Sequence, residues 1–62
     1  MMEGEEIIFW RRKRGYSQER LAKEIPVCVR QLSLYENNRV KNPSDWVYER
    51  IREILDIPKG DK

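Results

Sequence analysis

The sequence predicts an all-α fold in which four short helices form one small domain. Apolar residues recur in four segments at the three- and four-residue spacing of amphipathic helices, and a strand pattern is not evident. Residues that favour helix ends separate the segments: Gly15, Pro26, Asn38 and Pro58. A chain of 62 residues supports a single core and leaves little room for a deep catalytic pocket. We therefore interpret residues 1–62 as one domain.

The first helix is expected to run from residue 4 or 5 to residue 14, because Gly15 provides a natural stop. Its inner face carries Ile7, Trp10 and Arg11. The second helix is expected over residues 18–25, with Ser17 as its N-cap. It should end there, because the residue before Pro26 is biased out of the α region. Its buried residues should be Leu21, Ala22 and Ile25.

The third helix is expected over residues 29–37, with Cys28 at the cap position, where a Ser or Thr hydroxyl would serve better. Asn38 follows, and asparagine tolerates the left-handed conformation that ends many helices. The fourth helix is expected over residues 45–55, and the polar tail at 58–62 is expected to be flexible. The core residues expected between Pro26 and the end of the fourth helix are Val27, Leu32, Tyr35, Val47, Tyr48, Ile51, Ile54 and Leu55.

The net charge is only +2, but four cations follow one another at residues 11–14. They suit either a solvated helix end, where the helix dipole favours cations, or a basic patch for an anionic partner. The single cysteine, Cys28, cannot form an intramolecular disulfide, which favours a reducing compartment. The sequence has no long apolar run and no signal-peptide pattern, so we expect a cytoplasmic protein without a membrane span.

The sequence offers little for catalysis. It contains no histidine, so the usual general base and the commonest metal ligand are missing. It has no Cys-x-x-Cys pair and no glycine-rich phosphate loop. We expect no enzymatic activity, no cofactor, no metal site and no small-molecule ligand.

Several short motifs occur in the order and spacing of a known family. They are Gly-Tyr-Ser-Gln-Glu at 15–19, Leu-Ala at 21–22, Tyr-Glu-Asn-Asn-Arg at 35–39 and the downstream Pro43. With them, residues 7–57 resemble the phage repressor and Cro type of helix-turn-helix DNA-binding domain, also called the xenobiotic-response-element type. The resemblance implies a lambda-repressor-like fold of four helices, with the helix-turn-helix at about residues 17–37.

The chain departs from the family pattern at three positions. Pro26 stands in the turn where the family usually has glycine, and Cys28 stands where it usually has Ser or Thr. Asn38 replaces the glycine that commonly follows the acidic residue. Many members also have a fifth helix that dimerises, which we expect to be absent here.

The resemblance and the outward face of the third helix together suggest which residues would contact DNA. The expected base-reading residues are Val29, Arg30, Gln31 and Leu34. The expected phosphate-binding residues, which fix position without reading sequence, are Ser17, Gln18, Asn37, Arg39, Lys41 and Asn42. The family also places an ion pair between the positions of Arg11 and Glu36.

These features predict a sequence-specific regulator that binds double-stranded DNA, most simply a prokaryotic or phage repressor or autoregulator that occupies an operator. Such modules generally bind as homodimers, and Trp46 is a candidate dimer contact. The alternative is a protein-interaction module, such as an antitoxin or an adaptor, since Val29 and Leu34 are apolar on an outward face. DNA binding through phosphates would depend steeply on salt, whereas an apolar protein interface would not.

Overall fold

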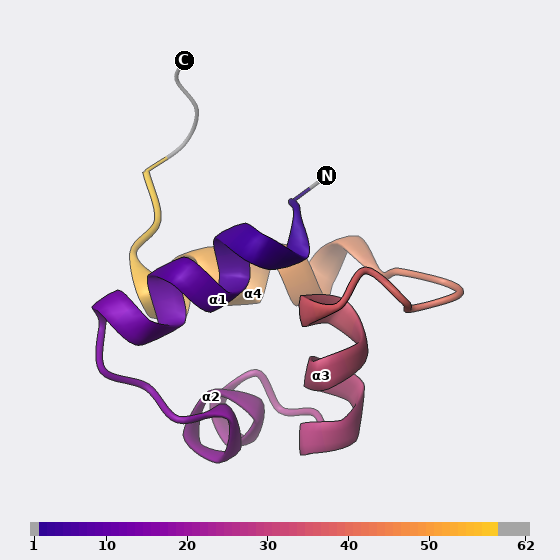
Figure 1. Ribbon diagram of the computed structural model, residues 1–62, viewed down its shortest axis with the longest axis horizontal. Coiled ribbons are helices and arrows are strands. Elements are labelled where there is room, and N and C mark those ends of the chain that lie inside the picture. The colour runs from indigo at the N-terminus through magenta and orange to yellow at the C-terminus, as the bar shows by residue number, and fades with distance from the viewer. Residues whose placement is uncertain (1, 59–62) are drawn as a thin grey trace.

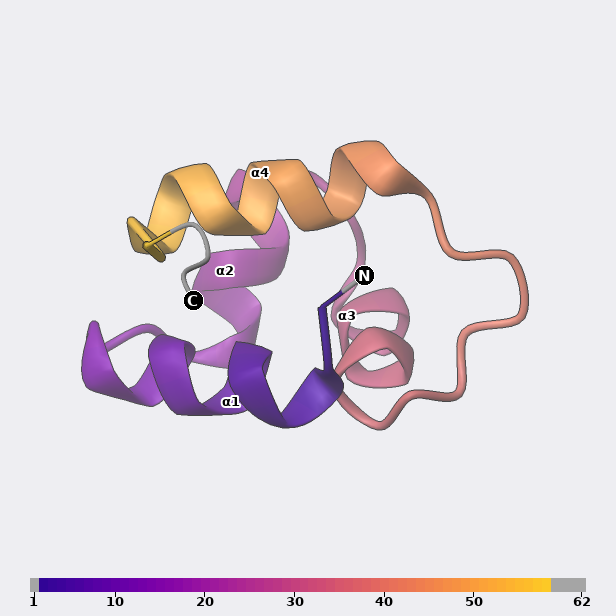
Figure 2. The ribbon, with the colours of Figure 1, turned by 90° about the horizontal axis from the view of Figure 1, so that it is seen from above.

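The computed structural model describes residues 2–58 and contains four helices in the expected order. They are α1 (Gly4–Lys13), α2 (Gln18–Glu24), α3 (Val29–Glu36) and α4 (Asp45–Leu55). No strand is present within the described range. α1 and α4 lie side by side, α2 lies beneath them, and the end of α3 meets the start of α1 (Figures 1 and 2). Of the tail for which flexibility was predicted, residues 59–62 lie outside the described range.

Three residues with left-handed backbone end the helices or follow them closely. Gly15 has φ +77° after α1, Asn38 has φ +58° after α3, and Asp56 has φ +54° after α4. The role expected of Asn38 is therefore confirmed: Arg39 N–H, one residue further on, donates to the Leu34 carbonyl at 2.8 Å. Each of the first three helices is slightly shorter than predicted, and α4 has the predicted bounds.

The two helices of the central pair begin with different caps. The Ser17 hydroxyl accepts a hydrogen bond from the Arg20 backbone N–H at 3.1 Å, so the N-cap predicted for α2 is confirmed. Cys28 occupies the same position before α3, and its side chain makes no capping bond. The start of α3 therefore has no side-chain acceptor for its free backbone N–H groups.

The turn between α2 and α3 differs in one respect from the expectation. Ile25 keeps helical angles, φ −63° and ψ −39°, although it precedes Pro26. Its side chain is completely buried and its N–H donates to the Leu21 carbonyl at 3.0 Å, so tertiary packing holds it in the helical region. The Ile25–Pro26 peptide bond is cis. Val27 N–H then donates to the Ala22 carbonyl at 2.7 Å and closes the turn.

One apolar core joins all four helices, and most of the predicted core residues lie in it. Trp10, Val27 and Ile54 are half-buried at its edge rather than enclosed. The Tyr35 and Tyr48 rings meet edge to face at 5.2 Å between centroids. The Tyr35 hydroxyl accepts from the Ser44 N–H at 3.0 Å and so links α3 to the start of α4. The buried apolar residues are Met2, Ile7, Leu21, Ala22, Ile25, Leu32, Tyr35, Val47, Tyr48, Ile51 and Leu55.

Gly4 allows α1 to approach the end of α3 closely. A Cβ at this position would overlap the Glu36 carbonyl, so only glycine fits without a shift. The Gly4 N–H also donates to the Asn38 Oδ1 at 2.9 Å. The first turn of α1 is therefore fixed directly to the C-terminal end of α3.

The four consecutive cations serve different purposes, so neither sequence interpretation covers all of them. Arg11 is half-buried and reaches into the domain. Arg14 donates from Nε to the Leu55 carbonyl at 2.7 Å and from Nη2 to the Asp56 carbonyl at 3.0 Å, which caps the end of α4. Arg12 and Lys13 lie on the exposed side of α1.

Candidate nucleic-acid interface

One side of α3 is buried and the opposite side faces outward. Leu32, Tyr35 and Glu36 form the buried side. Among the expected base-reading residues, Arg30 is exposed and Val29 is 37% exposed, while Gln31 and Leu34 are half-buried. The start of α3 lies at the opposite end of the domain from α1 (Figure 1). Val29 and Arg30, the exposed residues of this side, are therefore open to a partner.

The exposed cations near α3 are not paired within the protein. Among the salt bridges between residues 2–58, none involves Arg30, Arg39 or Lys41. All three side chains are exposed. Their charges are therefore available to an anionic partner without first breaking an internal ion pair.

The loop at 37–44 protrudes beyond the helices (Figure 2) and carries four of the expected phosphate-binding residues. Arg39, Lys41 and Asn42 are exposed on it. Asn37 is held differently, because its Nδ2 donates to the Ser33 carbonyl at 2.9 Å and to the Ser33 Oγ at 3.3 Å. A phosphate contact from that amide would compete with these two bonds.

Behind the outward face, a buried polar cluster joins three helices. Glu36 is only 4% exposed, and its Oε2 accepts from the Arg11 Nε at 2.7 Å. Its Oε1 accepts from the Gln18 Nε2 at 2.9 Å. The Arg11 Nη1 completes the cluster by donating to the Tyr16 carbonyl at 3.1 Å. Both carboxylate oxygens are thus satisfied, which a buried charge requires.

This cluster gives Gln18 a contact that the sequence analysis did not identify. Gln18 stands at the start of α2 and Glu36 at the end of α3, so their bond sets how the two helices meet. One amide hydrogen of Gln18 is engaged, and the second remains for an external acceptor. No local spacing connects residues 18 and 36, so this contact had no signal in the sequence. Ser17 likewise keeps its hydroxyl hydrogen, since its oxygen serves as the cap acceptor.

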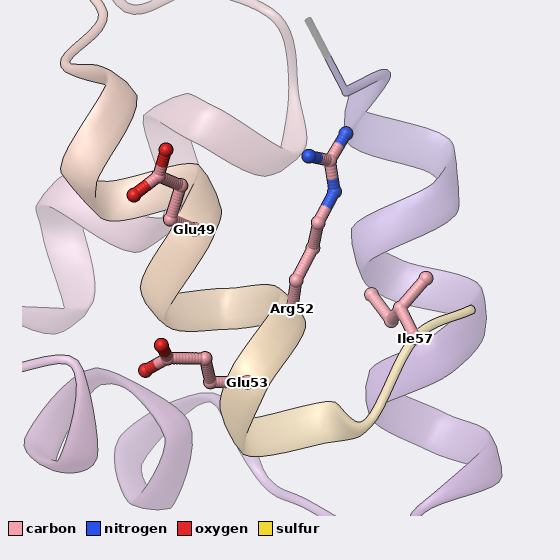
Figure 3. Close-up of a pocket in the computed structure, with 4 residues that line it drawn as sticks. All are labelled: Glu49, Arg52, Glu53 and Ile57. Carbon is pink, nitrogen blue, oxygen red and sulfur yellow. The ribbon is translucent and has the colours of Figure 1, made fainter. Parts of the chain in front are cut away.

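A hollow of about 380 Å³ lies beside α4 and is lined by Glu49, Arg52, Glu53 and Ile57. Figure 3 shows that Glu49 and Glu53 extend to one side of α4 and Arg52 to the other. Because these side chains diverge, the hollow does not bring charged groups to a common point. Residues 2–58 also contain no cluster of three potential metal ligands, and none of the described helices is long and apolar enough to cross a membrane.

The family model described as helix-turn-helix matches residues 7–61. The chain is 36% identical over 56 residues to the HTH-type transcriptional regulator SinR of Bacillus subtilis strain 168, and equally so to SinR of Bacillus licheniformis. Each alignment covers 90% of this chain and 50% of the relative. The chain therefore spans about half the length of these relatives.

A solved structure titled as a complex of SinR protein and SinI protein has a similar fold. Its TM-score against this chain is 0.81 at 36% sequence identity, and the match covers 90% of this chain and 54% of that one. The predicted all-α, lambda-repressor-like architecture is confirmed by this likeness together with the four helices described above.

Proposed function

Because the chain belongs to the helix-turn-helix family, we propose that it binds double-stranded DNA sequence-specifically and regulates transcription by occupying an operator. The observation that supports this most is the exposed face of α3, where Arg30 has no internal ion pair, on a helix braced by the buried Arg11–Glu36–Gln18 cluster. In this docking mode α3 enters the major groove while α2 crosses the DNA backbone. The rigid cluster would hold α3 at a constant angle to α2.

In this proposal the outward residues of α3 read the bases. A guanidinium such as that of Arg30 donates two hydrogen bonds to guanine O6 and N7, and the amide of Gln31 pairs with adenine N6 and N7. Val29 and Leu34 supply apolar contact to thymine methyl groups. The half-buried position of Gln31 and Leu34 makes Arg30 and Val29 the first of the four to meet a groove.

The phosphate contacts are assigned to Ser17, Gln18 and the protruding loop. Arg39, Lys41 and Asn42 are exposed donors on a segment that extends past the helices (Figure 2). Ser17 and Gln18 each retain one donor hydrogen beyond their internal bond. Asn37 would join only by releasing Ser33. Such contacts fix the register of the protein on the duplex without selecting its sequence.

The proposal includes binding as a homodimer, because one domain of this size covers too little DNA for strong specificity. Repression would follow from occupation of the operator, with no catalytic step and no cofactor. The relatives SinR carry the description of transcriptional regulators, which agrees with this role. Such a protein would act in the cytoplasm, where it meets bacterial or phage DNA.

The test is selection of bound duplexes from a random DNA pool, followed by titration of the recovered sequence at several salt concentrations. We expect a motif with two-fold symmetry and a binding constant whose logarithm falls by about 0.9 per phosphate contact for each unit of log salt. Recovery of no preferred sequence, with equal affinity for scrambled duplexes, would contradict sequence-specific binding.

The alternative function is that of a protein-interaction module, and the exposure of the apolar Val29 favours it. An interface of that kind would show little salt dependence and would be weakened most by Val29→Asp. The same salt titration therefore separates the two functions.

A further inference from the structure

The outer side of α1 carries an apolar centre between charges of opposite sign. Phe9 is 57% exposed and lies in a shallow hollow of about 530 Å³. Its ring meets that of Trp10 edge to face at 5.4 Å, and the Lys13 Nζ lies 5.7 Å from the Phe9 centroid. The residues that line the hollow are Glu5, Ile8, Phe9, Arg12 and Lys13.

This side of α1 is separate from the proposed DNA-binding face. α1 lies at one end of the domain and the start of α3 at the other (Figure 1). No salt bridge of residues 2–58 involves Glu5, Arg12 or Lys13, and the internal contacts of Lys13 are with the Phe9 and Trp10 rings. The surface is therefore available while DNA is bound.

The order of charges along α1 is self-complementary. Its first turn is acidic, with Glu5 and Glu6, and its last turn is basic, with Arg12 and Lys13. Phe9 is four residues from Glu5 and four from Lys13, which places each turn about 6 Å from it along the helix axis. An antiparallel second helix would therefore place an acidic turn over a basic turn at both ends, with Phe9 against Phe9 in the middle. A parallel second helix would place like charges together.

We propose that α1 is a homodimer interface, in which two copies of this chain pair their α1 helices antiparallel about a two-fold axis at Phe9. A two-fold axis requires a patch that complements itself, and this charge order meets that requirement. Glu5 and Lys13 line the same hollow, each four residues from Phe9, so the symmetry brings Glu5 of one copy to Lys13 of the other. The pairing does not depend on the proposed function, because the interface lies at the end of the domain away from the start of α3 (Figure 1).

The first experiment measures the mass of the full chain by sedimentation equilibrium across micromolar concentrations at low and high salt. We expect a monomer–dimer equilibrium. Phe9→Glu should shift it to monomer, because two negative charges, one from each copy, would meet at the two-fold axis. The matched control is Trp46→Glu, which alters an aromatic residue of similar exposure, 52%, on α4. Circular dichroism checks that both variants fold, as expected at exposed positions.

The decisive experiment uses charge reversal at the two partners. Glu5→Arg alone and Lys13→Glu alone should each weaken self-association by about tenfold, because like charges then face each other at both ends. When the two variants are mixed, opposite charges face each other again, and a heterodimer of near-parental affinity should form. Weakening by each single variant together with recovery on mixing indicates antiparallel pairing. A parallel pair would also attract on mixing, but neither variant alone would weaken it, because like charges face each other there in the parent as well.

Other results would overturn the inference. A chain that stays monomeric without DNA, a dimer lost with Trp46→Glu but kept with Phe9→Glu, or no recovery on mixing would each do so. A dimer that responds as expected while random duplexes yield no motif would leave this interface standing and reject the DNA-binding function. Selection of an asymmetric motif by a monomeric chain would leave the DNA-binding function standing and reject this interface.

Discussion

Glu36 is a carboxylate enclosed almost completely by protein and held by two side chains. Arg11 and Gln18 each donate one hydrogen bond to it, from α1 and from α2. Glu36→Ala would leave the half-buried Arg11 guanidinium without its partner, at a cost of roughly 3–5 kcal/mol in unfolding free energy. The net free energy of unfolding of a domain this small is only about 3–5 kcal/mol. We therefore expect the variant to be largely unfolded in thermal melts followed by circular dichroism.

The control for Glu36→Ala is Arg12→Ala, which removes an exposed cation next to Arg11 and should change the melting temperature little. A Glu36→Ala variant that melts together with the parent would show that the cluster contributes nothing to stability.

Arg30 carries the main prediction for DNA reading. Arg30→Ala should cost about 1–3 kcal/mol in binding to the selected sequence and should relax the preference at one or two base pairs. Lys41→Ala provides the contrast, since loss of a phosphate contact should weaken specific and scrambled duplexes alike. Fluorescence anisotropy with both duplexes measures the two effects. If Lys41→Ala selected a new motif, or if Arg30→Ala selected the parental motif unchanged, the assignment of Arg30 to base reading and of Lys41 to phosphate binding would be wrong.

At the scale of elements, the approach of α1 to α3 depends on the absence of a side chain at Gly4. Gly4→Ala would force its methyl group against the Glu36 carbonyl, and the helices would have to separate. Overpacking of this kind costs typically about 1–3 kcal/mol. Glu49→Ala, at an exposed position within α4, controls for the helix preference of alanine. Equal urea midpoints for the two variants would argue against a rigid contact.

The helices themselves were largely predictable, because their signals are local. Ser17 acts through its hydroxyl on a backbone N–H three residues away, and Gly15 and Asn38 act through their own backbone conformation. The predicted helix ends lie within one residue of the observed ones. The geometry of the turn at Pro26 could not be predicted. Ile25 has helical angles, in agreement with the predicted range of 18–25, although a residue before proline is biased out of that region.

Contacts between distant residues left no trace in the sequence. Gly4 was expected only to begin a helix, whereas its real constraint comes from a carbonyl more than thirty positions away. The bond from Gln18 to Glu36 is similar, and so is the Arg14 cap on the end of α4. The meeting of Arg11 with Glu36 was predicted from two signals: Arg11 lies on the inner face of its helix, where a charge needs a partner, and the family resemblance names that partner.

At the scale of the whole molecule, the two proposed interfaces occupy different ends of one small core. The buried cluster links α1, α2 and α3, so the helix proposed to pair with a second copy is joined directly to the helices proposed to meet DNA. Dimer geometry would therefore be transmitted to the spacing of the two α3 helices through rigid contacts. No flexible linker intervenes within residues 4–36 between these elements, apart from their short turns.

The stability of the whole domain should depend on pH in the alkaline range through Tyr48. Burial in the core, together with repulsion from Tyr35, Asp45 and Glu3, raises the pKa of Tyr48 above its ordinary value of 10.0. Below that pH the phenol is protonated in both the folded and the unfolded chain, and its contribution to stability is complete. Above it the unfolded chain ionises first, so the free energy of unfolding falls as the pH rises toward the folded-state pKa. Urea titrations between about pH 8 and pH 11 should show this fall for the parent. Tyr48→Phe should have a shallower fall, because phenylalanine cannot ionise. If both chains lose stability equally over this range, other groups control the alkaline transition.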